Sequence, residues 1–188
     1  MMKELIDNMH NGNLKKIESL LEELKSDKGI AEKDLVLILK QLPILVKRFR
    51  KTFVIERKGE NITWYEYETL IWTFGEVFRQ VLQKYRGLRR KEELLHNIEM
   101  MCKDKQFGKG RESYIMLLGQ YGGPERIPVL IELLDDQEIQ GHAVYSLRLL
   151  GAVEAEKKMY PFLHHEKSWI RKEAKKYYTK IGKNPTRN

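Results

Sequence analysis

A stripe of lysines follows a tryptophan close to the C-terminus of this chain. Steps of three and four residues place these side chains on one face of the last expected helix: Trp169, Lys172, Lys176 and Lys180. Cations clustered on one face are typical of a surface that binds phosphate groups or acidic proteins. A tryptophan at the head of the stripe adds a ring that can stack on nucleic-acid bases. The stripe is therefore the first candidate binding site.

The basic charge of the chain is concentrated around this stripe. Residues 157–188 contain 10 Lys and Arg against only Glu166 and Glu173, which accounts for the entire net charge of +8. A terminal helix of a repeat protein needs a polar outer face for solubility, and cations near the end of a helix interact favourably with its dipole. The last helix is thus either a solubility cap, which we slightly favour, or a binding site.

A second candidate for partner binding is Trp72. Helical spacing puts it off the apolar stripe of its own helix, on a face that also carries Tyr65, Glu68, Glu76 and Arg79. A partly exposed tryptophan beside an arginine is typical of the few residues that dominate the energy of protein–protein binding. Burial of Trp72 against the N-terminal helices is the alternative.

No set of residues in the sequence has the spacing of a known catalytic or metal centre. His164, His165 and Glu166 are adjacent, and adjacent histidines on a helix point in different directions, so a metal ion would need ligands from other turns. The sequence contains no glycine-rich phosphate loop, nucleophile elbow or pair of cysteines. We therefore expect no metal and no cofactor, and an enzyme is the less favoured interpretation.

The composition indicates a folded, helical protein in a reducing compartment. The 188 residues are 41% hydrophobic and 33% charged, as in folded domains. The single cysteine, Cys102, excludes an internal disulfide and lies on an expected apolar helix face. Because no apolar run approaches the length of a membrane span and the N-terminus lacks the hydrophobic stretch of a signal peptide, we expect a cytoplasmic protein.

Helices must position the candidate residues, and the apolar pattern predicts about ten of them. The clearest covers residues 63–85 and carries one continuous apolar stripe, which consists of Trp64, Tyr67, Ile71, Phe74, Phe78, Val81 and Tyr85. Thr63 and Glu66 have the spacing of a capping box at its start. Residues 53–62 are the least helical part of the chain, and a small hairpin or a plain loop fits them equally well.

Three copies of one pattern occupy the C-terminal half of the chain. The copies share a spacing of three, four and four residues, and they contain Arg111, Tyr114, Leu118 and Gly122, then Gln140, Ala143, Leu147 and Gly151, then Arg171, Ala174, Tyr178 and Gly182. The closing glycines are 29 and 31 residues apart, a period that indicates stacked helical hairpins. Each glycine suits a left-handed cap at the end of its helix.

The third copy, with Ile170-Arg171-Lys172-Glu173-Ala174, resembles the short HEAT-like repeats, whose second helix carries Val-Arg-x-x-Ala-x-x-x-Leu-Gly-x-Leu-Gly. The resemblance implies an all-α fold, a right-handed α-solenoid, with repeats at 88–122, 123–151 and 152–182, an N-terminal region 1–87 continuous with the stack, and a tail at 183–188. It also implies that the arginine of a copy pairs with an acidic residue between the helices. Asp135 or Asp136 would then bind Arg111 or Arg171.

The second helices of such repeats line the inner surface of the stack, which adds His142 and Arg148 to the candidate residues. Together with the lack of a catalytic set, the resemblance favours a non-enzymatic scaffold that binds a macromolecular partner, first of all a protein, on its concave surface. The alternative is nucleic-acid binding through the basic last repeat, with base-excision chemistry as in the repeat-built alkylpurine glycosylases. A similarity to the HEAT-like lyases that act on bilin-carrying proteins is more remote, because no residue marks a chromophore site.

Overall fold

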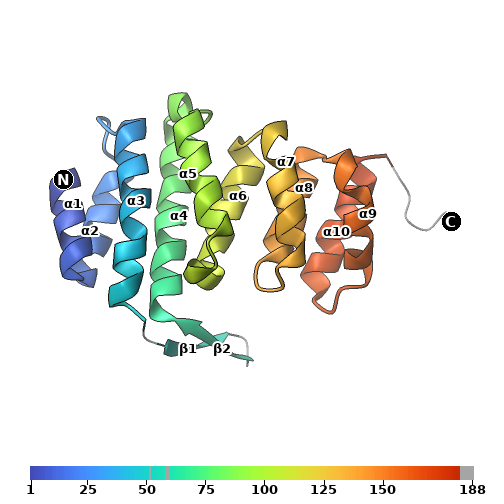
Figure 1. The fold of residues 1–188 in the computed structure, drawn as a ribbon, viewed down its shortest axis with the longest axis horizontal. Coiled ribbons are helices and arrows are strands. Elements are labelled where there is room, and N and C mark those ends of the chain that lie inside the picture. The colour runs from blue at the N-terminus through green and yellow to red at the C-terminus, as the bar shows by residue number, and fades with distance from the viewer. Residues whose placement is uncertain (51, 58–59, 183–188) are drawn as a thin grey trace. The chain divides into compact units, whose positions relative to one another are not determined.

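The computed structural model describes residues 1–50, 52–57 and 60–182 (Figure 1). Within these ranges the chain forms ten α-helices, short 3₁₀ turns and a single two-stranded antiparallel hairpin. The all-α prediction is therefore confirmed, whereas the solenoid and the expected tail at 183–188 stay predictions, the tail because it lies outside the described residues. The chain divides into two compact units, Met1–Tyr114 and Ile115–Asn188, here called unit 1 and unit 2.

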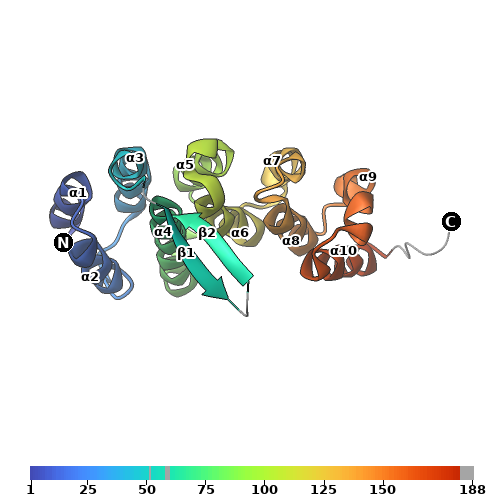
Figure 2. The ribbon, with the colours of Figure 1, turned by 90° about the horizontal axis from the view of Figure 1, so that it is seen from below.

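Unit 1 is built from helices on two sides of an apolar core. Its elements are, in order, α1 (Met2–Asn11), α2 (Leu14–Leu24), α3 (Glu32–Arg48), β1 (Thr52–Arg57), β2 (Glu60–Tyr65), α4 (Glu66–Lys84), η1 (Arg86–Leu88), α5 (Glu92–Lys103), η2 (Lys105–Arg111) and the start of α6 (Glu112–Tyr121). Figure 2 shows α1, α3 and α5 on one side of this unit, with α2 and α4 on the other. Apolar side chains at helical spacing fill the space between the two layers.

The apolar stripe predicted for α4 is largely the core of unit 1. Ile71, Phe74, Phe78 and Val81 are all buried. The first copy of the repeated pattern has Tyr114 where the other two have alanine, and the structure explains this difference. The ring of Tyr114 packs edge-on against Phe78, and its hydroxyl donates a hydrogen bond of 3.2 Å to the carbonyl of Ile71. The tyrosine therefore fills a space beside α4 and satisfies its own polar atom there.

Of the two alternatives for residues 53–62, the structure has the hairpin. Strand β1 pairs with β2 in an antiparallel register that sets Phe53 opposite Trp64 and Ile55 opposite Ile62. Because β2 continues through Thr63 to Tyr65, the capping box predicted at Thr63 is wrong. Helix α4 begins after the strand, and the carboxylate of Glu68 accepts a hydrogen bond of 3.3 Å from the backbone N–H of Tyr65.

Glu68 is also the buried polar residue that holds the loop before α6. Its second carboxylate oxygen accepts a hydrogen bond of 3.2 Å from the backbone N–H of Lys109. Next to it, Gly108 has a φ of 49°, and a Cβ at that position would lie 1.5 Å from Oε1 of Glu68. A glycine is required here for two independent reasons, its left-handed backbone and its close approach to the carboxylate.

Unit 2 contains two helical hairpins and the rest of α6. Its further elements are η3 (Pro124–Arg126), α7 (Ile127–Glu132), η4 (Leu133–Asp135), α8 (Gln140–Leu150), η5 (Val153–Ala155), α9 (Glu156–Met159), η6 (Tyr160–His164) and α10 (Ser168–Lys180). Within this unit α7 and α9 lie on one side, and α8 and α10 lie together on the other (Figure 2). In both hairpins the first helical segment is broken into short α and 3₁₀ pieces, and both segments contain a proline, which lacks a backbone donor.

The glycines that close the repeated pattern behave as predicted in two of three copies. Gly151 and Gly182 have φ values of 66° and 73°, and Gly151 caps α8 in the left-handed conformation. In the first copy the prediction is wrong, because the left-handed residue is Gly123 rather than Gly122. None of the predicted repeat boundaries falls at Tyr114, where the chain divides into two units. The repeats describe a period in the sequence and not compact units, so the predicted repeat boundaries stay a prediction.

Candidate binding surface on α8 and α10

The tryptophan at the head of the predicted lysine stripe, Trp169, is partly exposed. It lies in the first turn of α10, is 42% exposed, and contacts the first turn of α8. A Cβ added to Gly141 of α8 would lie 2.3 Å from Cη2 of the indole. Because only a glycine leaves room for the ring, the two helices hold one edge of Trp169 in place and leave the other to solvent.

His142 forms the side of this aromatic site. Its ring centroid lies 5.3 Å from that of Trp169. Burial, together with the smaller effect of the nearby charge of Lys167, lowers the pKa of His142 from its ordinary value to about 4. The imidazole is therefore neutral at pH 7 and acts as a second aromatic ring beside the indole.

A third ring continues the site along the loop before α10. His165 stacks on Phe162 with ring centroids 5.9 Å apart. One of its nitrogens, Nε2, lies 3.1 Å from the side-chain amide of Gln140, and the other, Nδ1, accepts a hydrogen bond of 3.0 Å from the backbone N–H of Lys167. Both nitrogens of His165 are thus engaged in fixing the loop, and a metal ligand there would have to break one of these bonds.

The charged residues of the surface form a compact network around one carboxylate. Glu173 of α10 accepts a hydrogen bond from Arg148 of α8 with one oxygen, and its other oxygen lies 2.7 Å from the ammonium group of Lys176. The guanidinium of Arg148 also lies 4.9 Å from the ring centre of Tyr145. Two of the predicted cations, Arg148 and Lys176, are therefore paired within the surface itself.

The remaining lysines of the stripe have different roles. The ammonium group of Lys180 donates a hydrogen bond of 2.6 Å to the carbonyl of Leu149, one of the last carbonyls of α8. Lys172 is exposed, and it has no hydrogen-bond or ion-pair partner in the part of the chain that the structure describes. The stripe thus divides into a helix cap at Lys180, a paired cation at Lys176 and an unpaired one at Lys172.

Of the two arginines for which the HEAT-like resemblance implied an acidic partner, Arg171 does not have one, whereas the pairing of Arg111 with Asp136 stays a prediction. The guanidinium of Arg171 donates hydrogen bonds of 2.6 and 2.7 Å to the backbone carbonyls of His165 and Glu166. Asp135 instead pairs with Lys158 at 2.6 Å. Arg171 therefore fastens the loop that precedes its own helix. Arg111 in unit 1 does the same, because its Nε donates to the carbonyl of Gly108 at 2.7 Å.

Trp72, the remaining candidate, lies in unit 1. It is half-buried on α4, and near it along the helix Arg79 pairs with Glu76 at 2.8 Å. Its predicted role in partner binding stays a prediction.

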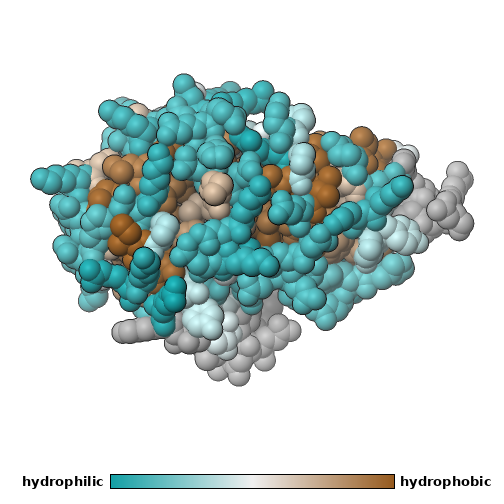
Figure 3. Space-filling view, in the orientation of Figure 1, coloured by the Kyte–Doolittle hydropathy of each residue, from teal (hydrophilic) through white to brown (hydrophobic). Residues whose placement is uncertain are grey.

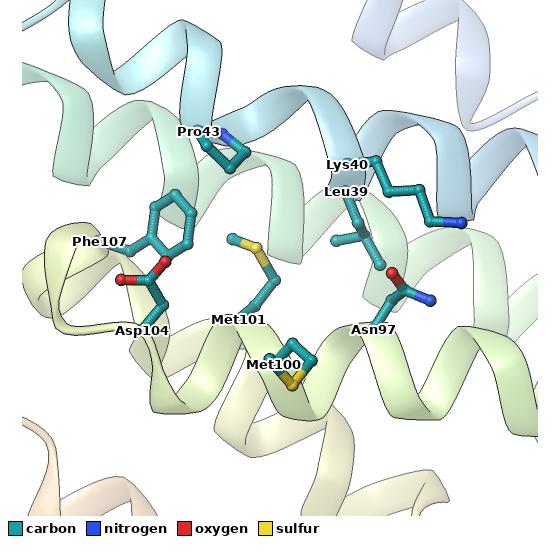
Figure 4. A pocket seen from close by; sticks show the side chains of 8 residues that line it. All are labelled: Leu39, Lys40, Pro43, Asn97, Met100, Met101, Asp104 and Phe107. Carbon is teal, nitrogen blue, oxygen red and sulfur yellow. The ribbon is translucent and has the colours of Figure 1, made fainter.

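A small pocket in unit 1 escaped the sequence analysis. It lies between α3 and α5, has a volume of about 190 Å³, and is lined by Leu39, Lys40, Pro43, Asn97, Met100, Met101, Asp104 and Phe107 (Figure 4). Figure 3 shows hydrophobic atoms among the hydrophilic ones over α3, where Leu37 and Ile44 are exposed. The sequence offers one sign of this pocket, the apolar residues of α3 that lie outside its core stripe. These residues do not show that α5 is the helix that forms the other wall of the pocket.

No protein-family model, curated protein or solved structure matches this chain. None of the described helices is both long and apolar enough to cross a membrane. A group of three or more His, Cys, Asp or Glu side chains able to hold a metal ion does not occur among the residues that the structure describes.

Proposed function

We propose that this protein is a non-enzymatic HEAT-like scaffold that binds a protein partner through the surface of α8 and α10. The observation that carries the proposal is Trp169, an indole held on Gly141 and against His142 with its outer edge exposed. Tryptophan is strongly enriched among the residues that dominate binding energy at protein interfaces. A ring that is already fixed loses little conformational entropy when a partner covers it, so more of its burial energy remains for binding.

The neighbouring charges support the same function. Arg148, Glu173 and Lys176 are linked into one network beside the ring, and Glu173 is nearly buried within it. Paired charges around an aromatic centre form the polar rim that protein interfaces commonly have. The rim fixes the orientation of a partner, while the ring supplies most of the contact energy.

A photo-crosslinking amino acid at position 169 tests this proposal. We expect benzoylphenylalanine in place of Trp169 to capture a discrete partner in cells that produce the protein. The matched control is the same replacement of Tyr160, which is 50% exposed on η6 and also packs against a histidine, His164. A partner captured at 169 but not at 160, and bound more weakly by a purified Trp169→Ala variant, supports the proposal. Equal capture at both positions, or none, contradicts it.

Nucleic-acid binding is the second candidate, and two exposed lysines favour it. Lys172 and Lys175 both lie on α10, and neither has a partner in the described part of the chain. Binding to phosphates would weaken steeply with salt because counterions are released. Titration of labelled duplex and single-stranded DNA and RNA at two salt concentrations decides this candidate. Binding no tighter than about millimolar at low salt removes it.

A further inference from the structure

The chemistry of the surface around Trp169 indicates which kind of protein segment it would bind, an inference that rests on the proposed function. Lys167 precedes the tryptophan by two residues and Lys172 follows it by three. Both side chains are exposed, and neither has a carboxylate partner among the residues that the structure describes. A fixed, half-exposed indole thus lies between two unpaired positive charges.

The same surface already binds a carboxylate of its own. Glu173 lies one helical turn after Trp169, and its two oxygens contact Arg148 and Lys176 separately. The side chains of Glu173 and Arg148 are only 13% and 19% exposed, so this contact is partly withdrawn from water. The surface therefore has the geometry to bind carboxylates beside an aromatic ring. Within the protein, the carboxylate of Glu173 is already bound in this way.

We propose that the Trp169 surface binds an acidic segment of a protein partner, with an apolar side chain of that segment against the indole and its carboxylates on Lys167 and Lys172. Charge complementarity selects this occupant. A nucleic acid fits less well, because Lys180, which would extend the cationic track along α10, is committed to the carbonyl of Leu149.

Two substitutions move the affinity in opposite directions. Glu173→Gln removes the internal carboxylate and frees Arg148 and Lys176, so an acidic segment should bind about threefold more tightly or better, the usual effect of an exposed charge pair. Lys172→Gln removes an unpaired cation and should weaken binding by a similar factor. Neither side chain is in the apolar core, so circular dichroism should show an unchanged fold for both variants.

Short fluorescein-labelled peptides provide the probe. One peptide carries glutamates on both sides of a central Phe-Leu pair, a second has glutamine in place of glutamate, and a third has glycine in place of Phe-Leu. A thymidine oligonucleotide of equal charge is the fourth probe. We expect the first peptide to bind the full-length protein most tightly, to weaken with salt, and to respond to both substitutions in the stated directions. Trp169→Ala should abolish the advantage of the first peptide over the third.

Three outcomes would overturn the inference. These are equal binding of the glutamate and glutamine peptides, no response to Glu173→Gln, and tighter binding of the oligonucleotide than of the acidic peptide. Each leaves the proposed function standing if crosslinking at position 169 still captures a protein. Conversely, selective binding of the acidic peptide without any captured partner would contradict the proposed function and leave the chemistry of the surface as stated.

Discussion

At the scale of single residues, Gly108 is a position that cannot accept a side chain without strain. Its φ of 49° and the 1.5 Å approach of a Cβ to Glu68 mean that alanine would strain the backbone and displace a buried, hydrogen-bonded carboxylate. We expect Gly108→Ala to lower the free energy of unfolding by ~2–4 kcal/mol. Urea unfolding followed by far-UV circular dichroism measures it.

Gly87→Ala is the matched control for this substitution. Gly87 lies in the same unit, its backbone is not left-handed, and a Cβ there would meet no atom within 4 Å. Its replacement should leave stability unchanged or raise it slightly, because alanine restricts the unfolded chain. If the two variants unfold at the same urea concentration, the close packing of Gly108 against Glu68 has no energetic importance.

A second residue, His142, makes stability depend on pH. Its pKa in the folded protein is lowered to about 4, below the ordinary value of 6.5, so the folded state resists protonation. The free energy of unfolding should therefore be unaffected above about pH 6.5 and fall as the pH drops toward 4. Between pH 7 and about pH 4.5 we expect His142 to account for a loss of about 2–2.5 kcal/mol.

The measurement compares urea unfolding of the native protein with that of His142→Gln across this pH range. The variant should lose less stability on acidification than the native protein. His164→Gln, at an exposed histidine of η6, is the control and should follow the native curve. Parallel curves for the native protein and His142→Gln would show that the ring beside Trp169 takes up protons as readily as a free histidine.

The residue scale is also where the sequence reveals least. The spacing of Trp169, Lys172 and Lys176 correctly put them on the exposed side of one helix. Their individual roles depend on atoms far away in the chain: Gly141 beneath the indole, and Arg148 across from Glu173. Helical periodicity contains no information on such pairs, since it describes one helix at a time.

At the scale of elements, the contact between Lys180 and α8 stabilises the end of one helix from another. The ammonium group at 2.6 Å from the carbonyl of Leu149 satisfies an acceptor that has no partner within its own helix. We expect Lys180→Met, which keeps the apolar stem, to cost ~0.5–1 kcal/mol in urea unfolding. Lys175→Met on the same helix removes an unpaired charge and should change stability by less than about half of that.

The apolar pattern predicts well where helices occur, but it predicts poorly where each helix begins and ends. The middle of the predicted α4 stripe, the burial of Cys102 and the number of helices among the described residues follow from periodicity and are confirmed. The start of α4 was predicted three residues too early, because Thr63 fits a capping box but is held in β2 by its pairing with Val54. A residue with the sequence signature of a helix cap can therefore lie in a strand instead, when a strand that pairs with it is nearby in the chain.

At the scale of the whole molecule, the division at Tyr114 predicts two blocks of cooperative unfolding. Gly108→Ala strains unit 1, and Gly141→Ala would force a Cβ to 2.3 Å from Trp169 in unit 2. In native-state hydrogen exchange we expect each variant to accelerate the buried amides of its own unit by about tenfold or more, and those of the other unit by much less. Equal acceleration of both units by either variant would mean that the chain unfolds as one block.

The whole-molecule features were only partly accessible from the sequence. A period of about thirty residues predicted paired helices, and the α7–α8 pair and the contact of α10 with η6 agree with it. The position of the division was not predictable, because it falls inside α6, where neither composition nor a glycine marks a boundary. Compactness depends on which residues meet, and a sequence pattern records only their order.

The carboxylate of Glu173 has a consequence for selectivity. Because it is attached to the same helix as Lys176, it competes for Arg148 and Lys176 at the high effective concentration of an intramolecular group. Free acetate, glutamate or another small carboxylate has to compete with this attached group for the same two cations. As proposed, a segment bound on Trp169 would place its carboxylates on Lys167 and Lys172, the two cations that Glu173 leaves unpaired, so this surface would respond to multivalent segments more than to monovalent metabolites.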